Sequence, residues 1–207
     1  MKRVSCVVAL VISAVSVNLQ AAPHCGELES SYGPYDYADA SQRQKYLGIV
    51  ERFHFTPNIE NLVSGNSGPV GGELNYTLNT FPNHHRALAA LAKLALRDKT
   101  IKPIGTKYSV HCYFERAIRF KPSDPVVRMV YGNYLQKLGQ PDKAIDQFIV
   151  AVNLQPEDPT INYNLGLLYM EKKDYEQART HARKAYDQGF PLPGLKNKLV
   201  EAGKWED

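Results

Sequence analysis

Apolar side chains recur three and four residues apart along most of the chain from about residue 40 onward. That spacing places them on one face of an α-helix. The first such face consists of Tyr46, Leu47, Ile49, Val50 and Phe53. A glycine-rich stretch at residues 65–72 interrupts the pattern, and we expect it to be a flexible connection between helices. The pattern therefore predicts an all-α protein.

Two helix starts can be placed in the first half of the chain. Thr56 precedes Pro57, so a helix is expected to begin there with Thr56 as its cap. Asn83 precedes an apolar helical stretch, His84–Arg97, and Asn83 is its expected cap.

The second half of the chain repeats itself with a period of 34 residues. Asp124 recurs at Asp158, and Gly132 recurs at Gly166. Two segments also share the spacing four, three, five: Val110, Phe114, Ala117 and Pro122 in one, and Ala144, Phe148, Ala151 and Pro156 in the other. Such a period indicates helix pairs that stack on one another, because no single pair can bury its own apolar faces.

These residues resemble the tetratricopeptide repeat (TPR). Residues 125–158 match its pattern at Tyr131, Gly132, Leu135, Ala144, Phe148, Ala151 and Pro156. Residues 159–192 match at Leu165, Gly166, Tyr169, Ala178 and Ala185, and depart from it at Ala182 and Phe190. Residues 84–124 resemble a degenerate repeat, because extra residues around 99–106 separate its two helices. The resemblance implies a TPR-type helical-hairpin solenoid.

The first half is also similar to a group of exported bacterial proteins with such repeats. The similarity lies in residues 53–60 (FHFTPNIE) and 76–88 (YTLNTFPNHHRAL). It implies no particular activity.

We expect the chain to be organised into seven segments. They are a signal peptide (1–22), an extended arm rich in Tyr, Pro and Gly (23–39), an N-terminal helical region with room for a further degenerate repeat (40–83), a degenerate repeat (84–124), two repeats (125–158 and 159–192), and a capping helix with a tail (193–207).

The N-terminus has the pattern of a secretory signal peptide. Lys2 and Arg3 precede an apolar run of 14 residues, Val4–Val17, and small residues follow at Ala21 and Ala22. The run is shorter than the roughly 20 residues of a membrane-spanning helix, which makes an uncleaved inner-membrane anchor the less favoured alternative. Cleavage would leave 23 basic and 21 acidic side chains, which gives a formal charge of +2. We therefore expect a periplasmic protein with no integral membrane segment after cleavage.

Two cysteines remain after such a cleavage, Cys25 and Cys112. An even number of cysteines in an exported chain favours a disulfide, and two free thiols are the alternative. Cys112 lies two residues after Val110, about 200° around the helix from the packed face. A bond to Cys25 would therefore carry the arm across the outer, convex surface and leave the inner face of the solenoid open.

The first helix of each repeat is expected to line that inner, concave face. We predict a partner-binding groove there, formed by Met129, Asn133, Gln136, Lys137, Tyr163, Asn164, Leu167 and Met170. Asparagine amides can donate to and accept from an extended backbone, and methionine and tyrosine supply adaptable contact area. The alternative is that the upstream helices or the arm of the same chain cover this face.

The sequence contains little that points to catalysis. Adjacent histidines such as His84 and His85 point about 100° apart on a helix, so they cannot easily share a metal. The small net charge does not favour nucleic acid or an anionic membrane as a partner. We therefore expect a non-enzymatic scaffold or adaptor without cofactor or metal, which binds a protein or peptide and supports assembly of a complex in the bacterial cell envelope. The alternative is a small metal-binding or hydrolytic protein that uses His84 and His85, with the repeats as an appendage.

Overall fold

The structure is a computed structural model that describes residues 25–28 and 30–205. The predicted signal peptide, residues 1–22, lies outside the described residues. The helices are α1 (Ala40–Gln42), a π-helical stretch (Arg43–Leu47), α2 (Gly48–His54), α3 (Pro57–Glu60), α4 (Val70–Thr80), α5 (His85–Arg97), α6 (Val110–Phe120), α7 (Pro125–Lys137), α8 (Pro141–Leu154), α9 (Pro159–Glu171), α10 (Tyr175–Asp187) and α11 (Gly194–Glu201). Over the described residues, all regular structure is helical, and none of these helices has the length and apolarity needed to cross a membrane.

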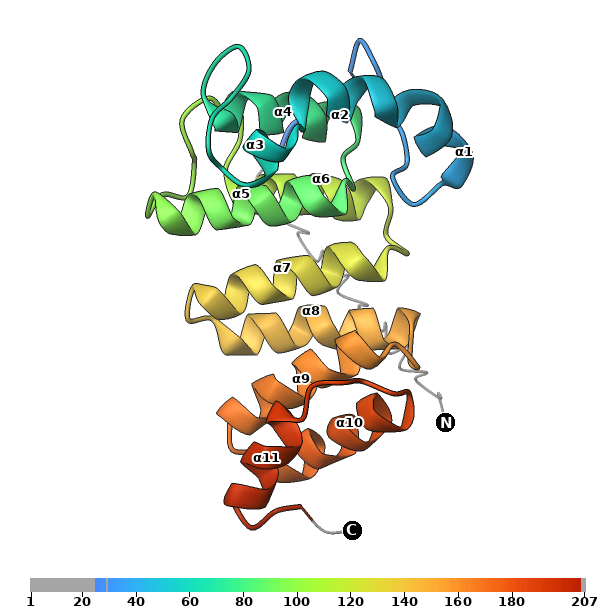
Figure 1. Cartoon of the computed structure of the whole chain (residues 1–207), viewed down its shortest axis with the longest axis vertical. Helices are drawn as coiled ribbons and strands as arrows, with labels where there is room; N and C mark the ends of the chain where they lie inside the picture. Colours follow the sequence, from blue (N-terminus) through green and yellow to red (C-terminus); the bar gives the residue numbers. More distant parts are fainter. Residues whose placement is uncertain (1–24, 29, 206–207) are drawn as a thin grey trace, which may run out of the picture.

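From α5 onward the helices form antiparallel pairs, α5–α6, α7–α8 and α9–α10, which stack into an elongated column (Figure 1). Loops within the pairs (98–109, 138–140 and 172–174) lie along one side, which we call the hairpin-loop edge. Loops that follow each pair (121–124, 155–158 and 188–193) lie along the other, the return-loop edge. The prediction of an all-α helical-hairpin solenoid is confirmed.

The aspartates that recur with the period cap the first helices of the two repeats. The carboxylate of Asp124 accepts from the backbone N–H groups of Val126 (3.0 Å) and Val127 (3.2 Å). Asp158 accepts from the N–H of Ile161 at 2.8 Å. Each cap satisfies backbone donors that have no partner inside the helix.

Tight packing within a pair depends on a glycine. A Cβ atom on Gly132 of α7 would lie only 2.6 Å from the ring of Phe148 on α8. That ring is fully buried, as are Ala144 and Ala151 on the same face of α8. The two helices can therefore approach only because residue 132 has no side chain.

Two local predictions were wrong. The N-cap of α5 is His84, whose Nδ1 accepts from the N–H of Ala87 at 3.1 Å, and not Asn83. The glycine-rich connection ends at Pro69, and Gly71 lies in the first turn of α4. The glycine at position 71 is needed because the backbone of Ile104 packs too closely there for any side chain.

Aromatic stacking and buried polar contacts hold the first half of the chain together. Tyr35 of the arm stacks on Tyr46 with ring centroids 3.9 Å apart, and Tyr37 stacks on His84 at 4.2 Å. Asn83 is fully buried, and its amide donates both to Asp36 of the arm (2.8 Å) and to Asp124 (3.0 Å). The arm is thus packed onto its own chain.

Candidate functional site

The concave face of the last two repeats carries a shallow cavity of about 610 Å³. Gln136 of α7 and Leu167 and Met170 of α9 form its floor. The C-terminal helix α11 and the residue after it supply the opposite wall, with Lys198, Glu201 and Ala202. The amide of Gln136 donates to Glu171 at 3.1 Å, so the two helices are joined by a polar contact at the rim.

The structure places the eight predicted groove residues in different environments. Gln136, Leu167 and Met170 line the cavity. Lys137 is exposed, whereas Asn133 and Asn164 are half-buried. Met129 is partly buried and packs against the central core.

Tyr163 is not exposed, so that part of the prediction was wrong. Its ring stacks on Phe190 at a centroid distance of 4.1 Å, and only 9% of the residue is accessible. The reason is α11, whose first residue, Gly194, lies against the Tyr163 hydroxyl. Leu195 and Leu199 of α11 are fully buried in the same cluster. The chain therefore covers one end of the concave face with its own downstream helix, rather than with the upstream arm.

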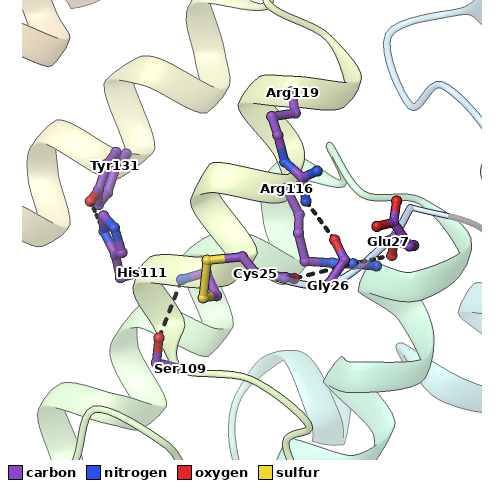
Figure 2. Close-up of a disulfide and its surroundings, with 9 residues drawn as sticks. Cys25, Gly26, Glu27, Ser109, His111, Arg116, Arg119 and Tyr131 are labelled. Carbon is purple, nitrogen blue, oxygen red and sulfur yellow. Dashed lines mark hydrogen bonds between the residues drawn. A yellow bond between two sulfur atoms is a disulfide. The ribbon is translucent and has the colours of Figure 1, made fainter. Parts of the chain in front are cut away.

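Cys25 and Cys112 form a disulfide with a Cα–Cα distance of 5.0 Å, as predicted. Figure 2 shows Arg116 and Arg119 of α6 directed toward the arm, while His111 points toward Tyr131 on α7. Arg116 donates to the backbone carbonyls of Cys25 (3.4 Å) and Glu27, and Arg119 donates to that of Gly26 at 2.6 Å. The arm is thus fixed on α6, a second helix of its pair, away from the cavity between α7, α9 and α11.

The adjacent histidines have separate partners. His84 is fully buried and its Nε2–H donates to Glu51 at 3.2 Å, while desolvation lowers its pKa. His85 donates through Nε2 to Asp124 at 2.8 Å. Burial acts to raise the pKa of Asp124, but its hydrogen bonds, first among them that from His85, hold this pKa below its usual range. Across the described residues, no three His, Cys, Asp or Glu side chains are close enough together to hold a metal ion.

Sequence reasoning missed a second cavity of about 520 Å³ on the hairpin-loop edge. Its walls include His111 of α6, Tyr131 and Leu138 near α7, and Lys143 of α8, with Ile101 at its rim. His111 and the hydroxyl of Tyr131 are hydrogen-bonded. The signal that could have located it is the insertion around residues 99–106, since extra residues between two helices of a repeat must project from that edge.

Similarity to known proteins supports the fold. The sequence model of the tetratricopeptide repeat family matches residues 132–191. A thermophilic TPR protein of Thermus thermophilus, TTC0263, superposes with a TM-score of 0.55 at 17% identity, covering 80% of this chain and 87% of that one. For pilF of Pseudomonas aeruginosa the TM-score is 0.54 at 20% identity, covering 78% and 69%. At these identities the likeness concerns the fold. No curated protein sequence matches significantly.

The matched segment runs from the middle of α7 to the loop after α10. It spans the two repeats predicted from the period, and the Gly132–Phe148 contact belongs to it. Residues 132–191 of this chain therefore match the tetratricopeptide repeat family.

Proposed function

We propose that this chain is a non-enzymatic scaffold, exported to the bacterial cell envelope, that binds a protein or peptide and supports assembly of an envelope complex. The observation that carries the proposal is the cavity between α7, α9 and α11. Its residues combine the apolar Leu167 and Met170 with the polar Gln136 and with charges of both signs on α11. Adaptable apolar contacts combined with polar anchors suit a peptide or a helix laid into a groove.

Two further observations support the envelope as its location. The pattern of residues 1–22 is that of a signal peptide, and such segments direct export. The Cys25–Cys112 disulfide fits an oxidising compartment, since cytosolic thiols are kept reduced. Export and a role in assembly remain proposals.

The test is photocrosslinking in cells from two positions. One photoreactive residue replaces Gln136 at the cavity, and the matched control replaces Thr180, which is exposed on α10. We expect one envelope protein to be captured from position 136 and not from position 180. Equal capture from both positions, or capture from position 136 of this chain's own residues alone, would contradict the proposal.

Fractionation of the same cells tests export. The chain should be released with the periplasmic contents, shortened by about 22 residues. Recovery at full length in the cytosol would overturn the envelope assignment and leave the binding groove to be tested in that compartment.

A further inference from the structure

The most exposed large apolar side chains lie in two loops that contact each other. In the described part of the chain these are Ile104 at 84%, and Val63 and Ile101 at 72% each. Ile101 and Ile104 belong to the inserted loop 98–109, and Val63 belongs to the neighbouring loop 61–69. The two loops touch, because Gly105 packs against Pro69, and Arg97 at the end of α5 donates to the carbonyl of Leu62 at 2.8 Å. Scattered exposed apolar residues are ordinary, but three such residues on two contacting loops call for a physical explanation.

Internal contacts hold the inserted loop in this shape. The hydroxyl of Thr106 donates to the carbonyl of Pro103 at 2.7 Å, and both residues are buried. The N–H of Val110 donates to the carbonyl of Ile101 at 2.9 Å, which closes the loop onto the start of α6. Gly105 packs directly against Pro69 and Gly72, so a side chain there would collide with them. The loop therefore presents its isoleucines from a fixed backbone.

Three exposed lysines share the inserted loop with the exposed isoleucines. Lys99, Lys102 and Lys107 are all exposed on the same loop. The nearest acidic residue in sequence, Asp98, is paired with Arg97 at 2.8 Å. Further along the hairpin-loop edge lie the exposed Lys137 and Lys173, together with the exposed Asp174. On the return-loop edge, Glu157 is exposed, Asp158 is half-buried and Lys121 is paired with Asp36 at 2.9 Å.

We infer that the hairpin-loop edge binds the surface of an anionic membrane, with Ile101, Ile104 and Val63 entering the headgroup region and the lysines contacting lipid phosphates. Apolar side chains combined with lysines are the composition of interfacial membrane contacts. Lysine is depleted in protein–protein interfaces, which favours lipid over a protein partner here. The small net charge of the whole chain did not indicate this surface, because acidic residues elsewhere in the chain balance the lysines of the loop. The inference goes beyond the proposed scaffold function, because it adds a surface that would hold the solenoid side-on to a bilayer.

Co-sedimentation with lipid vesicles tests the inference on residues 23–207, which retain every described contact. Vesicles of equal parts phosphatidylglycerol and phosphatidylcholine are compared with phosphatidylcholine alone. The parent protein should bind the anionic vesicles, and binding should weaken as salt is raised. Lys99→Gln, Lys102→Gln and Lys107→Gln together should lower the partition coefficient roughly 100-fold, since each lysine contributes about fivefold. Ile101→Ser with Ile104→Ser should lower it about tenfold.

The matched control is Leu192→Ser with Leu154→Ser, two exposed apolar residues, 57% and 41% accessible, in or next to the loops of the return-loop edge. It should leave vesicle binding unchanged, and all variants should keep the thermal midpoint of the parent because the changed side chains are exposed. Absence of parent binding to anionic vesicles, or equal losses in loop and control variants, would overturn the inference. Loss of a protein crosslink in cells with unchanged vesicle binding would also overturn it, and would assign the edge to a protein partner.

Discussion

The two halves of this molecule are held together in different ways. In residues 125–192, small and apolar residues recur at the same positions of successive pairs, and Ala144, Ala151, Ala178 and Ala185 are all fully buried. In residues 25–124, the buried groups include Asn83, His84 and Arg116, each with its own set of partners. The repeats are thus stabilised by a periodic packing rule, and the first half by contacts that occur once.

The difference decides how each half can be weakened. A periodic interface depends on close approach of helices, so added volume should be most damaging there. The first half depends on links between positions far apart in sequence, such as the disulfide across 87 residues and the Asn83–Asp36 bond across 47. Removing one such link should be most damaging there.

The largest effect should come from the disulfide. Replacing Cys25 and Cys112 by serine should lower the free energy of unfolding by about 4–5 kcal/mol, because the closed loop is long and its closure restricts the unfolded chain. Chemical denaturation of the two proteins measures this value. Hydrogen exchange should accelerate in α4 and α6, where the arm is docked, more than in α9 and α10. An unchanged denaturation midpoint would mean that the arm's other contacts suffice to hold it.

Added volume in the repeats should have the next largest effect. Gly132→Val should destabilise the protein by about 3 kcal/mol, because its Cβ would meet the Phe148 ring at 2.6 Å. The matched control is Gly48→Ala in the N-terminal helix, where nothing lies within 4 Å of the added atom. That change should be neutral or stabilising by about 0.5 kcal/mol. Equal destabilisation by both changes would show that packing in the repeats is looser than the structure indicates.

Asp124 and Asp158 occupy the same position in successive repeats, so the two halves can be compared at equivalent residues. Asp124 is 3% exposed and accepts from Asn83 and His85 as well as from its helix, whereas Asp158 is half-buried and caps its helix. Asp124→Ala should cost about 2–3 kcal/mol, since it removes a cap and leaves buried donors without an acceptor. Asp158→Ala should cost about 1 kcal/mol. Thermal unfolding of both variants checks the difference, and similar losses would show that the buried donors find other partners.

The period explains why the repeats could be predicted from the sequence. Gly132 and the aspartate caps recur after 34 residues, and their structural roles follow from residue size and hydrogen-bonding capacity alone. The disulfide followed from the number of cysteines and an exported context. In both cases the prediction needed only the spacing of residues along the chain or the number of cysteines.

The buried Tyr163, the His84 cap and the cavity at Tyr131 depend on contacts between distant parts of the chain. The spacing of residues in the sequence does not reveal such contacts. Tyr163 occupies a groove position of its repeat, yet α11 folds back over it, because Gly194 permits close approach to its hydroxyl. His84 replaces Asn83 as the helix cap because Asn83 is required by Asp36 and Asp124. The cavity at Tyr131 and the lysine-rich loop follow from an insertion whose position the period revealed, but whose conformation it did not.

The last expected difference between the two halves is their response to pH. His181 in the second half faces the neutral amide of Asn162 at 2.9 Å, and burial lowers its pKa from 6.5 to about 4, with a smaller contribution from Lys184. His84 in the first half instead faces the carboxylate of Glu51, which partly offsets the effect of burial. The unfolded state therefore binds a proton at position 181 more readily than the folded state between these two pKa values.

Stability from His181 is thus fully present above its unfolded pKa and declines as the pH falls toward about 4. Between about pH 7.5 and about pH 5, the parent should lose about 2 kcal/mol more than His181→Gln, which keeps a neutral donor to Asn162 and does not titrate. Urea unfolding across this range measures the difference, and the carboxylates common to both proteins cancel in it. If the two pH profiles run parallel, His181 takes up its proton as readily in the folded state as in the unfolded state. The interior of the last repeat would then accommodate a charged imidazole, contrary to what its buried contact with Asn162 predicts.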